Sequence, residues 1–130
     1  MLIYHLALAS HWARAVETGS YRTSTLGRTL EQEGFIHCSY EEQVAGVRAA
    51  FYADVEEPVL VLSVETTLLT APWRVDDVVG PDGTAARFPH VYGPIDVAAV
   101  VAVTPLLPEP AREADEAGET TPDVVRTAAG

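Results

Sequence analysis

The sequence predicts an α+β fold, made of twisted and mostly antiparallel sheets with two or three short helices. Two observations carry this prediction. Apolar runs of strand length recur over the first 107 residues, and the segments with helical features are concentrated in the first half instead of alternating with strands. The chain has 130 residues, of which 48% are hydrophobic and 21% charged, which is typical of a single globular domain.

The first expected elements are a strand and a helix. Residues 2–8 mix aromatic and aliphatic side chains, as strands do. Ser10 fits the N-cap of a short helix and Gly19 fits its end, because serine can cap free N–H groups and glycine readily adopts the left-handed conformation. A second helical segment is expected over residues 26–33, with Gly34 at its end.

A second strand and a third helix are expected next. The strand covers residues 35–38. Ser39 and Glu42 have the spacing of a capping box, in which each side chain satisfies an exposed backbone N–H. The helix that this box opens carries apolar residues on one face: Val44, Val47 and Phe51.

The second half of the chain is expected to form strands. Residues 59–64 are a nearly continuous aliphatic run, which predicts an inner strand. Residues 73–79 and 87–92 favour extended structure, with a turn over residues 81–83 between them. Residues 97–103 form the longest apolar run of the chain and predict the last inner strand.

The composition changes near residue 107. Residues 108–130 contain no aromatic side chain, and they hold six acidic residues against two arginines. Such a segment cannot bury enough apolar surface to offset the entropy lost on ordering. We therefore expect a single domain over residues 1–107 and an acidic, disordered tail over residues 108–130.

The charge balance limits the partners. The chain carries 19 acidic and 8 basic residues, for a net charge of −11, and every basic residue is arginine. Nucleic-acid binding needs clustered basic groups, so no nucleic-acid partner is expected. The absence of lysine also excludes Schiff-base chemistry and a P-loop. No apolar run approaches the ~18 residues that cross a membrane, and the N-terminus lacks a signal-peptide pattern, so a cytoplasmic location is expected.

Three of the four histidines interrupt apolar segments of the domain: His5, His37 and His90. An imidazole in such a position needs hydrogen-bonding partners, and each of these stands close to a tyrosine or serine. They are predicted to converge on one polar cleft, where histidine suits acid–base chemistry near neutral pH. The alternative is that each is a satisfied structural residue. The three are isolated along the chain and form no close-set ligand motif, so no metal is expected.

A cysteine and a serine follow His37, which raises the possibility of a nucleophilic site. Cys38 is adjacent to His37, but neighbouring strand residues point to opposite faces. Cys38 is therefore expected to be a core residue, since free cysteine behaves as a small hydrophobe. Ser39 would share the face of His37 if the strand continued by one residue.

Arg74 and Asp76 alternate on the strand expected over residues 73–79, so they point to the same face. One interpretation is an exposed ion pair with little effect on stability. The other is an arginine that binds an anion such as a phosphate or carboxylate, held in place by Asp76.

Several motifs together resemble domain-of-unknown-function family 952, over about residues 2–106. The residues that carry this resemblance are Ile3–Ala7, Trp12, Gly19, Tyr21, Glu33–Ser39, Gln43, Phe51, Tyr52 and Phe88–Pro94.

The resemblance implies a compact relative of the ADP-ribosyltransferase fold. Tyr4 and His5 on an early strand, a helix and then Gly19 match the order of elements in that superfamily. It implies that His5 is similar to the histidine that contacts a ribose of NAD, which makes NAD a candidate cofactor. His37 and Ser39 are similar to the His-x-Ser element of RNA 2′-phosphotransferases. The sequence shows no clear counterpart of the catalytic glutamate of ordinary ADP-ribosyltransferases.

Two functions are consistent with these features. The first is an enzyme that acts on a small phosphorylated or nucleotide-like ligand in a histidine-lined cleft. The second is a non-catalytic domain that binds a small ligand on the same scaffold. The expected catalytic residues are His37, His90 and His5, and the expected ligand-binding residues are Tyr21, Ser39, Arg74, Asp76 and Tyr92.

Overall fold

A computed structural model describes residues 1–25, 28–80 and 82–106 of the chain. It has an α+β architecture with antiparallel sheets and short helices, which confirms the predicted fold class. The acidic tail expected over residues 108–130 lies outside the described residues, as does Pro81 of the expected turn. Among the described residues, no helix is long and apolar enough to cross a membrane.

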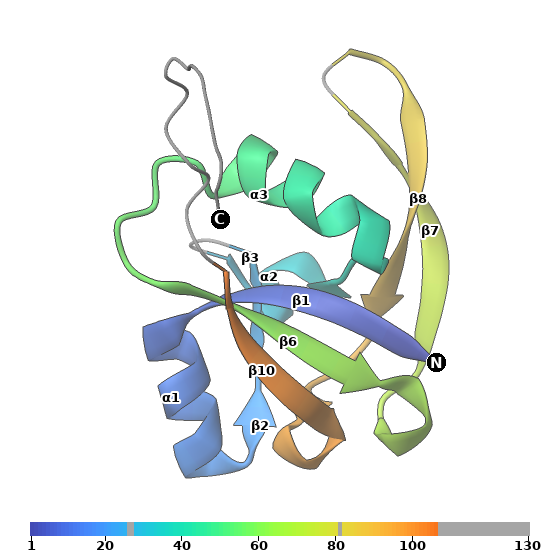
Figure 1. The fold of residues 1–130 in the computed structure, drawn as a ribbon. Helices are drawn as coiled ribbons and strands as arrows, with labels where there is room; N and C mark the ends of the chain where they lie inside the picture. Colours follow the sequence, from blue (N-terminus) through green and yellow to red (C-terminus); the bar gives the residue numbers. More distant parts are fainter. Residues whose placement is uncertain (26–27, 81, 107–130) are drawn as a thin grey trace.

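One antiparallel sheet has the strand order β1 (Leu2–Leu8), β6 (Val59–Glu65) and β10 (Val100–Leu106) (Figure 1). The predicted strand over residues 2–8 and the predicted inner strand over residues 59–64 are both confirmed, because β6 lies between its two neighbours. Ile3, Leu62 and Val64 of this sheet are completely buried.

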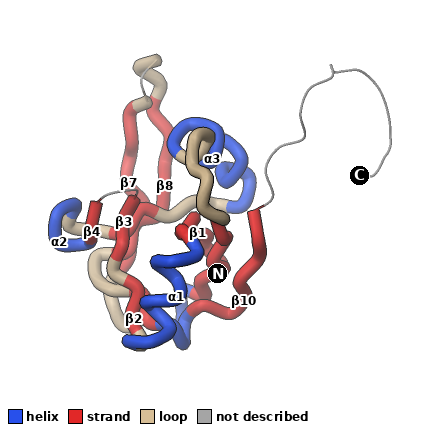
Figure 2. Tube along the Cα trace, turned by 90° about the vertical axis from the view of Figure 1, so that its left-hand side faces the viewer, coloured by secondary structure: helices blue, strands red, loops and turns tan. Residues whose placement is uncertain are grey.

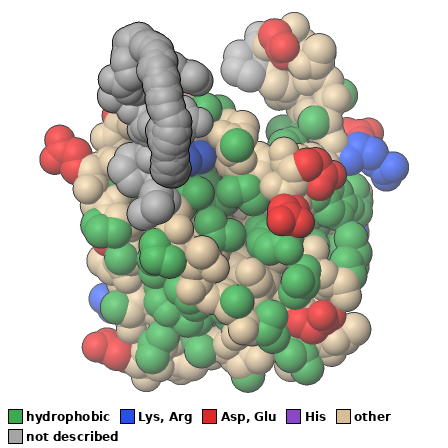
Figure 3. All heavy atoms as spheres, viewed as in Figure 1, with side chains coloured by type: hydrophobic (Ala, Val, Ile, Leu, Met, Phe, Trp, Pro, Cys, Tyr) green, Lys and Arg blue, Asp and Glu red, His purple; other side chains and the backbone are tan. Residues whose placement is uncertain are grey.

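The prediction of an inner strand over residues 97–103 was wrong. Val97–Ala99 forms a 3₁₀ turn, and β10 begins only at Val100 and pairs with β6 alone. It is therefore an edge strand, and Val101 and Val103 are 54% and 40% exposed. Figure 3 shows this face of the molecule, where hydrophobic side chains are part of the surface.

A second antiparallel sheet has the order β5 (Ile36–His37), β8 (Ala85–Val91) and β7 (Trp73–Val79). The strand predicted over residues 73–79 is confirmed. The far end of the β7–β8 hairpin projects from the body of the molecule beside α3 (Val44–Phe51) (Figures 1 and 2).

The remaining strands are two or three residues long and pair locally. β2 (Ser20–Tyr21) pairs with β9 (Ile95–Asp96), and β3 (Thr23–Thr25) pairs with β4 (Arg28–Thr29). These strands were not predicted, since segments so short carry no periodic pattern.

The first helix, α1 (Ala9–Thr18), begins two residues earlier than predicted, so Ser10 is not its N-cap. Leu8 occupies that position, and the backbone N–H of Ser10 donates to Glu57 Oε2 at 2.6 Å. Gly19 ends the helix as predicted, with φ of +87° in the left-handed region.

The helix expected over residues 26–33 is only one turn long, α2 (Leu30–Glu33). It starts at a capping box between Thr29 and Gln32, whose backbone N–H groups bond to each other's side chains. Gly34 ends this helix as predicted.

The capping box predicted at Ser39 and Glu42 was wrong. The backbone N–H and C=O of Ser39 pair with Tyr4 at 2.7 and 2.8 Å, so Ser39 extends the sheet instead of opening a helix. The helical segment starts after Tyr40, whose N–H donates to Gln43 Oε1 at 2.9 Å. A 3₁₀ turn (Glu41–Gln43) then leads into α3.

The core fills the space between the two larger sheets and the helices. The completely buried side chains include Ile3, Ile36, Cys38, Leu62, Val64, Val91 and Ile95. A second cluster, around Leu6, Val47, Tyr52 and Val59, attaches α3 to the sheet of β1 and β6.

Candidate functional site

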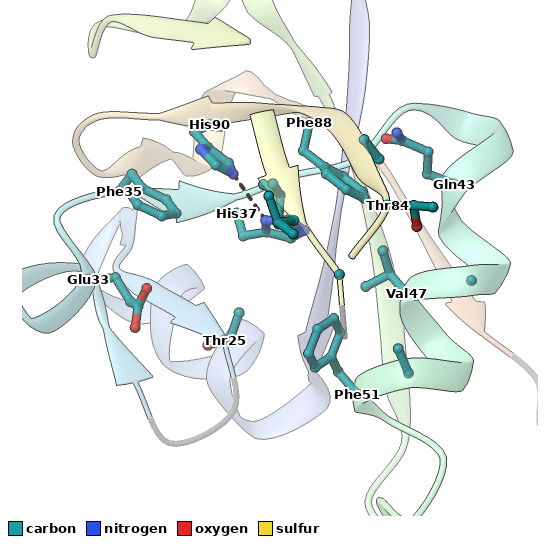
Figure 4. Close-up of a pocket in the computed structure, with 16 residues that line it drawn as sticks. Thr25, Glu33, Phe35, His37, Gln43, Val47, Phe51, Thr84, Phe88 and His90 are labelled. Carbon is teal, nitrogen blue, oxygen red and sulfur yellow. Dashed lines mark hydrogen bonds between the residues drawn. The ribbon is translucent and has the colours of Figure 1, made fainter. Parts of the chain in front are cut away.

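A pocket of about 530 Å³ opens between α3, the β7–β8 hairpin and the segments that contain β3, α2 and β5 (Figure 4). This volume is within the range of pockets that bind small molecules. Its walls are mainly apolar and aromatic, and they include Phe35, His37, Val47, Phe51, Phe88 and His90. No arginine is among the described residues that line it.

His37 and His90 meet at the wall of this pocket because their strands pair in exact register. The Cα atoms of the two residues are partners in the β5–β8 ladder. His37 Nδ1 lies 3.1 Å from His90 Nε2, as the dashed line in Figure 4 shows. Phe35 stacks on the His90 ring at 4.1 Å between centroids, and Phe88 packs against His37 at 4.8 Å.

Asp76 binds the second ring nitrogen of His90, the one that does not face His37. Arg74 and His90 are register partners in the β7–β8 ladder, and Asp76 lies two residues further along the same face. Asp76 Oδ2 accepts hydrogen bonds from His90 Nδ1, at 2.8 Å, and from the Tyr92 hydroxyl, while Oδ1 accepts one from Arg74 Nε at 2.9 Å. The bond from Tyr92, followed by those from His90 and Arg74, lowers the pKa of Asp76 to about 2. Asp76 is therefore ionised at neutral pH.

The carboxylate sets the tautomers of both histidines. Because Asp76 accepts from His90 Nδ1–H, a neutral His90 has its lone pair on Nε2. That nitrogen then accepts from His37 Nδ1–H, which leaves the lone pair of His37 on Nε2. Burial, followed by the proximity of His90 and His5, lowers the pKa of His37 to about 4. We call the chain of contacts Asp76–His90–His37 the histidine relay.

His5 lies behind His37 and is 2% exposed. Its Nδ1–H donates to the backbone carbonyl of His37 at 2.7 Å, and its Nε2 therefore accepts from the Tyr21 hydroxyl at 3.0 Å. Burial lowers the pKa of His5 to about 4, so the ring is neutral. With both nitrogens bonded to protein groups, His5 fixes the strand that carries His37 and does not face the pocket.

The predicted ligand-binding residues lie on two sides of the relay. Tyr21 and Ser39 are 1% exposed and do not line the pocket. Arg74, Asp76 and Tyr92 are on the side of His90 away from the pocket lining. The Arg74 side chain is 69% exposed and its guanidinium stacks over Tyr92, 4.5 Å from the ring centroid.

Cys38 points away from His37, as strand alternation predicts. It is completely buried in the core, and burial raises the pKa of its thiol. Such a thiol does not ionise at neutral pH, so it carries no nucleophilic chemistry. In the part of the chain that the structure describes, no three His, Cys, Asp or Glu side chains are arranged to hold a metal ion.

Sequence reasoning missed the rest of the lining. Phe35 and Phe88 each stand two residues from a relay histidine, and that spacing places them on the same strand face. Glu33 brings a carboxylate into the pocket and is bonded to Arg28 Nε at 2.8 Å. Glu33 ends a one-turn helix, and no sequence signal marks it as facing a pocket.

These features define a small α+β protein with a polar histidine relay in the wall of an apolar pocket. The chain belongs to the family described as proteins of unknown function, DUF952, whose sequence pattern matches residues 6–103. This confirms the family that the motifs resemble.

The fold is similar to that of the protein CC0527 from Caulobacter crescentus, known from X-ray crystal structures of the wild type and of a double mutant. The identities are 28% and 27%, each comparison covers 81% of this chain and 85% of the other, and each TM-score is 0.63. No curated protein matches the chain significantly.

Proposed function

We propose that the chain is an enzyme that acts on a small nucleotide-like or phosphorylated ligand bound in the pocket. The observation that carries this proposal is the histidine relay, in which an ionised carboxylate orients two imidazoles at the pocket wall. An acid–base group needs a fixed tautomer and a partner that stabilises its protonated form, and the relay supplies both.

In this proposal His37 is the general base and acid, acting through Nε2. A proton taken from the ligand or from water onto His37 Nε2 allows the Nδ1 proton to shift toward His90, whose positive charge is stabilised by Asp76. His90 is thus the second acid–base group, and Asp76 is a positioning residue. His5 and Tyr21 hold the strand of His37 in place.

The pocket lining supports a ligand with a flat, weakly polar part. Phe35, Phe51 and Phe88 offer aromatic surfaces on which a nucleobase or pyridine ring can stack. Glu33 and Gln43 add polar groups at the edges. Arg74 lies outside the pocket lining, on the far side of His90, and a phosphate that extends past His90 would meet its exposed guanidinium, of which only Nε is bonded to Asp76.

A scaffold related to the ADP-ribosyltransferases is part of this proposal, and NAD is the first cofactor to test. The order of Tyr4 and His5, α1 and Gly19 supports that relationship. Glu33 brings a carboxylate into the pocket from α2, where it is paired with Arg28 Nε at 2.8 Å. The net charge of −11 supports a small ligand over a nucleic acid, and a cytoplasmic location also belongs to the proposal.

The second candidate is a non-catalytic domain that binds a small ligand. It is favoured by the mainly apolar lining of the pocket, since such a lining binds ligands without chemistry. The two candidates differ in whether the His37 and His90 imidazoles, which Asp76 orients, catalyse conversion of the bound ligand.

The experiment is a thermal-shift screen with NAD, ADP-ribose and nucleoside phosphates, followed by product analysis by mass spectrometry. The enzyme proposal expects at least one compound to stabilise the protein and to be converted. Stabilisation without conversion would favour the binding domain. No stabilisation by any of these compounds would contradict the proposed ligand class.

A further inference from the structure

A second, much smaller cavity lies behind the pocket. It measures about 10 Å³ and is lined by residues of β1, β3, β5 and α3, and also by Ser39, which does not line the larger pocket. Four residues line both spaces, Thr25, His37, Val47 and Phe51, so the small cavity adjoins the pocket. Figure 4 labels these four residues in the lining of the pocket. Its volume is about that of one water-sized group.

Two buried polar atoms of this cavity lack a hydrogen-bonding partner among the described residues: Ser24 Oγ and His37 Nε2. Ser24 is completely buried on β3, and both residues line the cavity. An unpaired buried polar group is destabilising, so two around one cavity call for an occupant that satisfies both.

Two other polar side chains of the cavity lining, those of His5 and Tyr52, have hydrogen-bonding partners. His5 uses both ring nitrogens, and the Tyr52 hydroxyl donates to the Leu6 carbonyl at 3.2 Å. The occupant is therefore inferred from the two buried atoms that remain unpaired, Ser24 Oγ and His37 Nε2.

We propose that this cavity is a subsite for one hydroxyl group, which donates a hydrogen bond to His37 Nε2 and exchanges a second one with Ser24 Oγ. In the free protein the hydroxyl is that of a water molecule, and in the complex it is a hydroxyl of the ligand. The second part rests on the proposed function.

The hydrogen-bonding chemistry of the two atoms limits which chemical groups can occupy the cavity. The relay leaves His37 Nε2 with a lone pair, so the occupant must donate to it. A phosphate oxygen or a carbonyl oxygen accepts only and leaves the lone pair unsatisfied. An ammonium group donates to both atoms, but burying its charge here is costly without a carboxylate in the cavity lining. A hydroxyl group donates and accepts, and it fits the volume.

The subsite places that hydroxyl on the atom that the proposed function assigns as the base. A ligand hydroxyl in this position has its proton directed at His37 Nε2, with Ser24 fixing the oxygen. The proposal therefore points to ligands that carry a sugar hydroxyl next to a flat ring, and the flat ring would lie among Phe35, Phe51 and Phe88.

The first test is crystallographic. High-resolution crystals of the full chain without ligand should show one water within hydrogen-bonding distance of both Ser24 Oγ and His37 Nε2. Crystals with ADP-ribose should show a ribose hydroxyl in its place. A dry cavity, or a direct bond between Ser24 and His37, would overturn the subsite. A water that stays when ADP-ribose binds would overturn the assignment to a ligand hydroxyl.

The second test uses Ser24→Ala. The control is Ser63→Ala on β6, a serine that does not line the small cavity. If the subsite is occupied, Ser24→Ala lowers the melting temperature and weakens ADP-ribose binding about 2- to 13-fold, which corresponds to one neutral hydrogen bond of about 0.5–1.5 kcal/mol. If the cavity is dry, removing an unpaired hydroxyl raises the melting temperature, and the proposal fails. If the wild type binds neither ADP-ribose nor any other compound of the screen, the proposed ligand class fails, while the water and the melting temperature still decide the subsite.

Discussion

The Asp76 carboxylate and the His90 imidazole lie 2.8 Å apart, Oδ2 to Nδ1, although 14 positions separate them in the chain. This contact directs the second nitrogen of His90 toward His37 and makes a connected relay out of two histidines. It also accounts for the position of Asp76, which faces Arg74 and Tyr92 instead of open solvent.

Asp76→Asn should reduce kcat by about 100-fold or more, since an amide in this position no longer stabilises the imidazolium form of His90. KM should change little, because Asp76 does not line the pocket. The comparison is steady-state kinetics on the substrate found in the screen. The control is Asp77→Asn on the opposite strand face, where the carboxylate is 74% exposed and lies 3.5 Å from Arg87 Nε. Equal losses in both variants would contradict the relay.

His37→Ala and His90→Ala should each lose turnover by about 10²–10⁴-fold while ligand affinity is largely retained, since a proton-transfer group acts mainly in the transition state. Affinity is measured by titration calorimetry and turnover by mass spectrometry. If both variants keep full turnover, the two histidines are structural. If turnover is absent in the wild type and both variants lose affinity, the protein is a binding domain.

Arg74→Ala should weaken the binding of phosphorylated ligands by about 1.5–3 kcal/mol, the usual contribution of a charge-assisted hydrogen bond. The corresponding nucleosides should bind equally well to the variant and the wild type. Calorimetry at two salt concentrations separates this effect from general electrostatics. Arg87→Ala is the control, because Arg87 is an exposed arginine on the neighbouring strand. A loss of nucleoside binding in Arg74→Ala would point to a disturbed relay.

The stability of the protein should fall as the pH drops from about 6.5 to 4. Burial lowers the pKa of His5 and of His37 from 6.5 to about 4, so within this window the unfolded chain binds more protons than the folded one. The contribution of each neutral imidazole is complete above pH 6.5, amounts to about 3 kcal/mol, and is lost as the pH falls. Urea denaturation between pH 7 and 4 measures it.

His11→Gln, on α1 and outside the relay, is the control for this pH dependence and should retain most of it. A free energy of unfolding that stays constant from pH 7 to 4.5 would show that the two buried rings are not held neutral by the fold.

Gly93→Ala should destabilise the protein by about 1–3 kcal/mol, as overpacking does. A Cβ at this position would lie 2.6 Å from the Ala71 Cβ, so the turn after Tyr92 would have to move. Gly46→Ala is the contrasting variant, since α3 leaves nothing within 4 Å of a Cβ there. It should stabilise the protein by about 0.4–1 kcal/mol. Thermal melting of the two variants measures these changes. Equal shifts in melting temperature for Gly93→Ala and Gly46→Ala would contradict the close packing at Gly93.

The strands that the sequence predicts well are those with a long pattern. The apolar runs of β1 and β6 and the alternation in β7 predict their bounds closely. Where a local sequence pattern and pairing with a distant strand favour different structures, the pairing determines the structure. Ser39 has the spacing of a helix cap, but its backbone pairs with Tyr4.

The candidate site shows the same division. Strand alternation predicts that Arg74 and Asp76 share a face and that Cys38 faces away from His37. It does not predict that His37 and His90, 53 positions apart, are register partners, because register between distant strands depends on the whole fold. For the same reason the burial of His5 and the exposure of Glu33 to the pocket had no sequence signal.

The pairing of β1 with β6 also has a consequence for synthesis on the ribosome. Leu8 finds its register partner only at Val59, so β1 emerges roughly 50 residues before the strand that covers it. At about 5–20 residues per second this interval lasts seconds, during which Ile3 and Leu6 are exposed to water and to other nascent chains. The strand that carries His5 is thus made well before the strand that it pairs with.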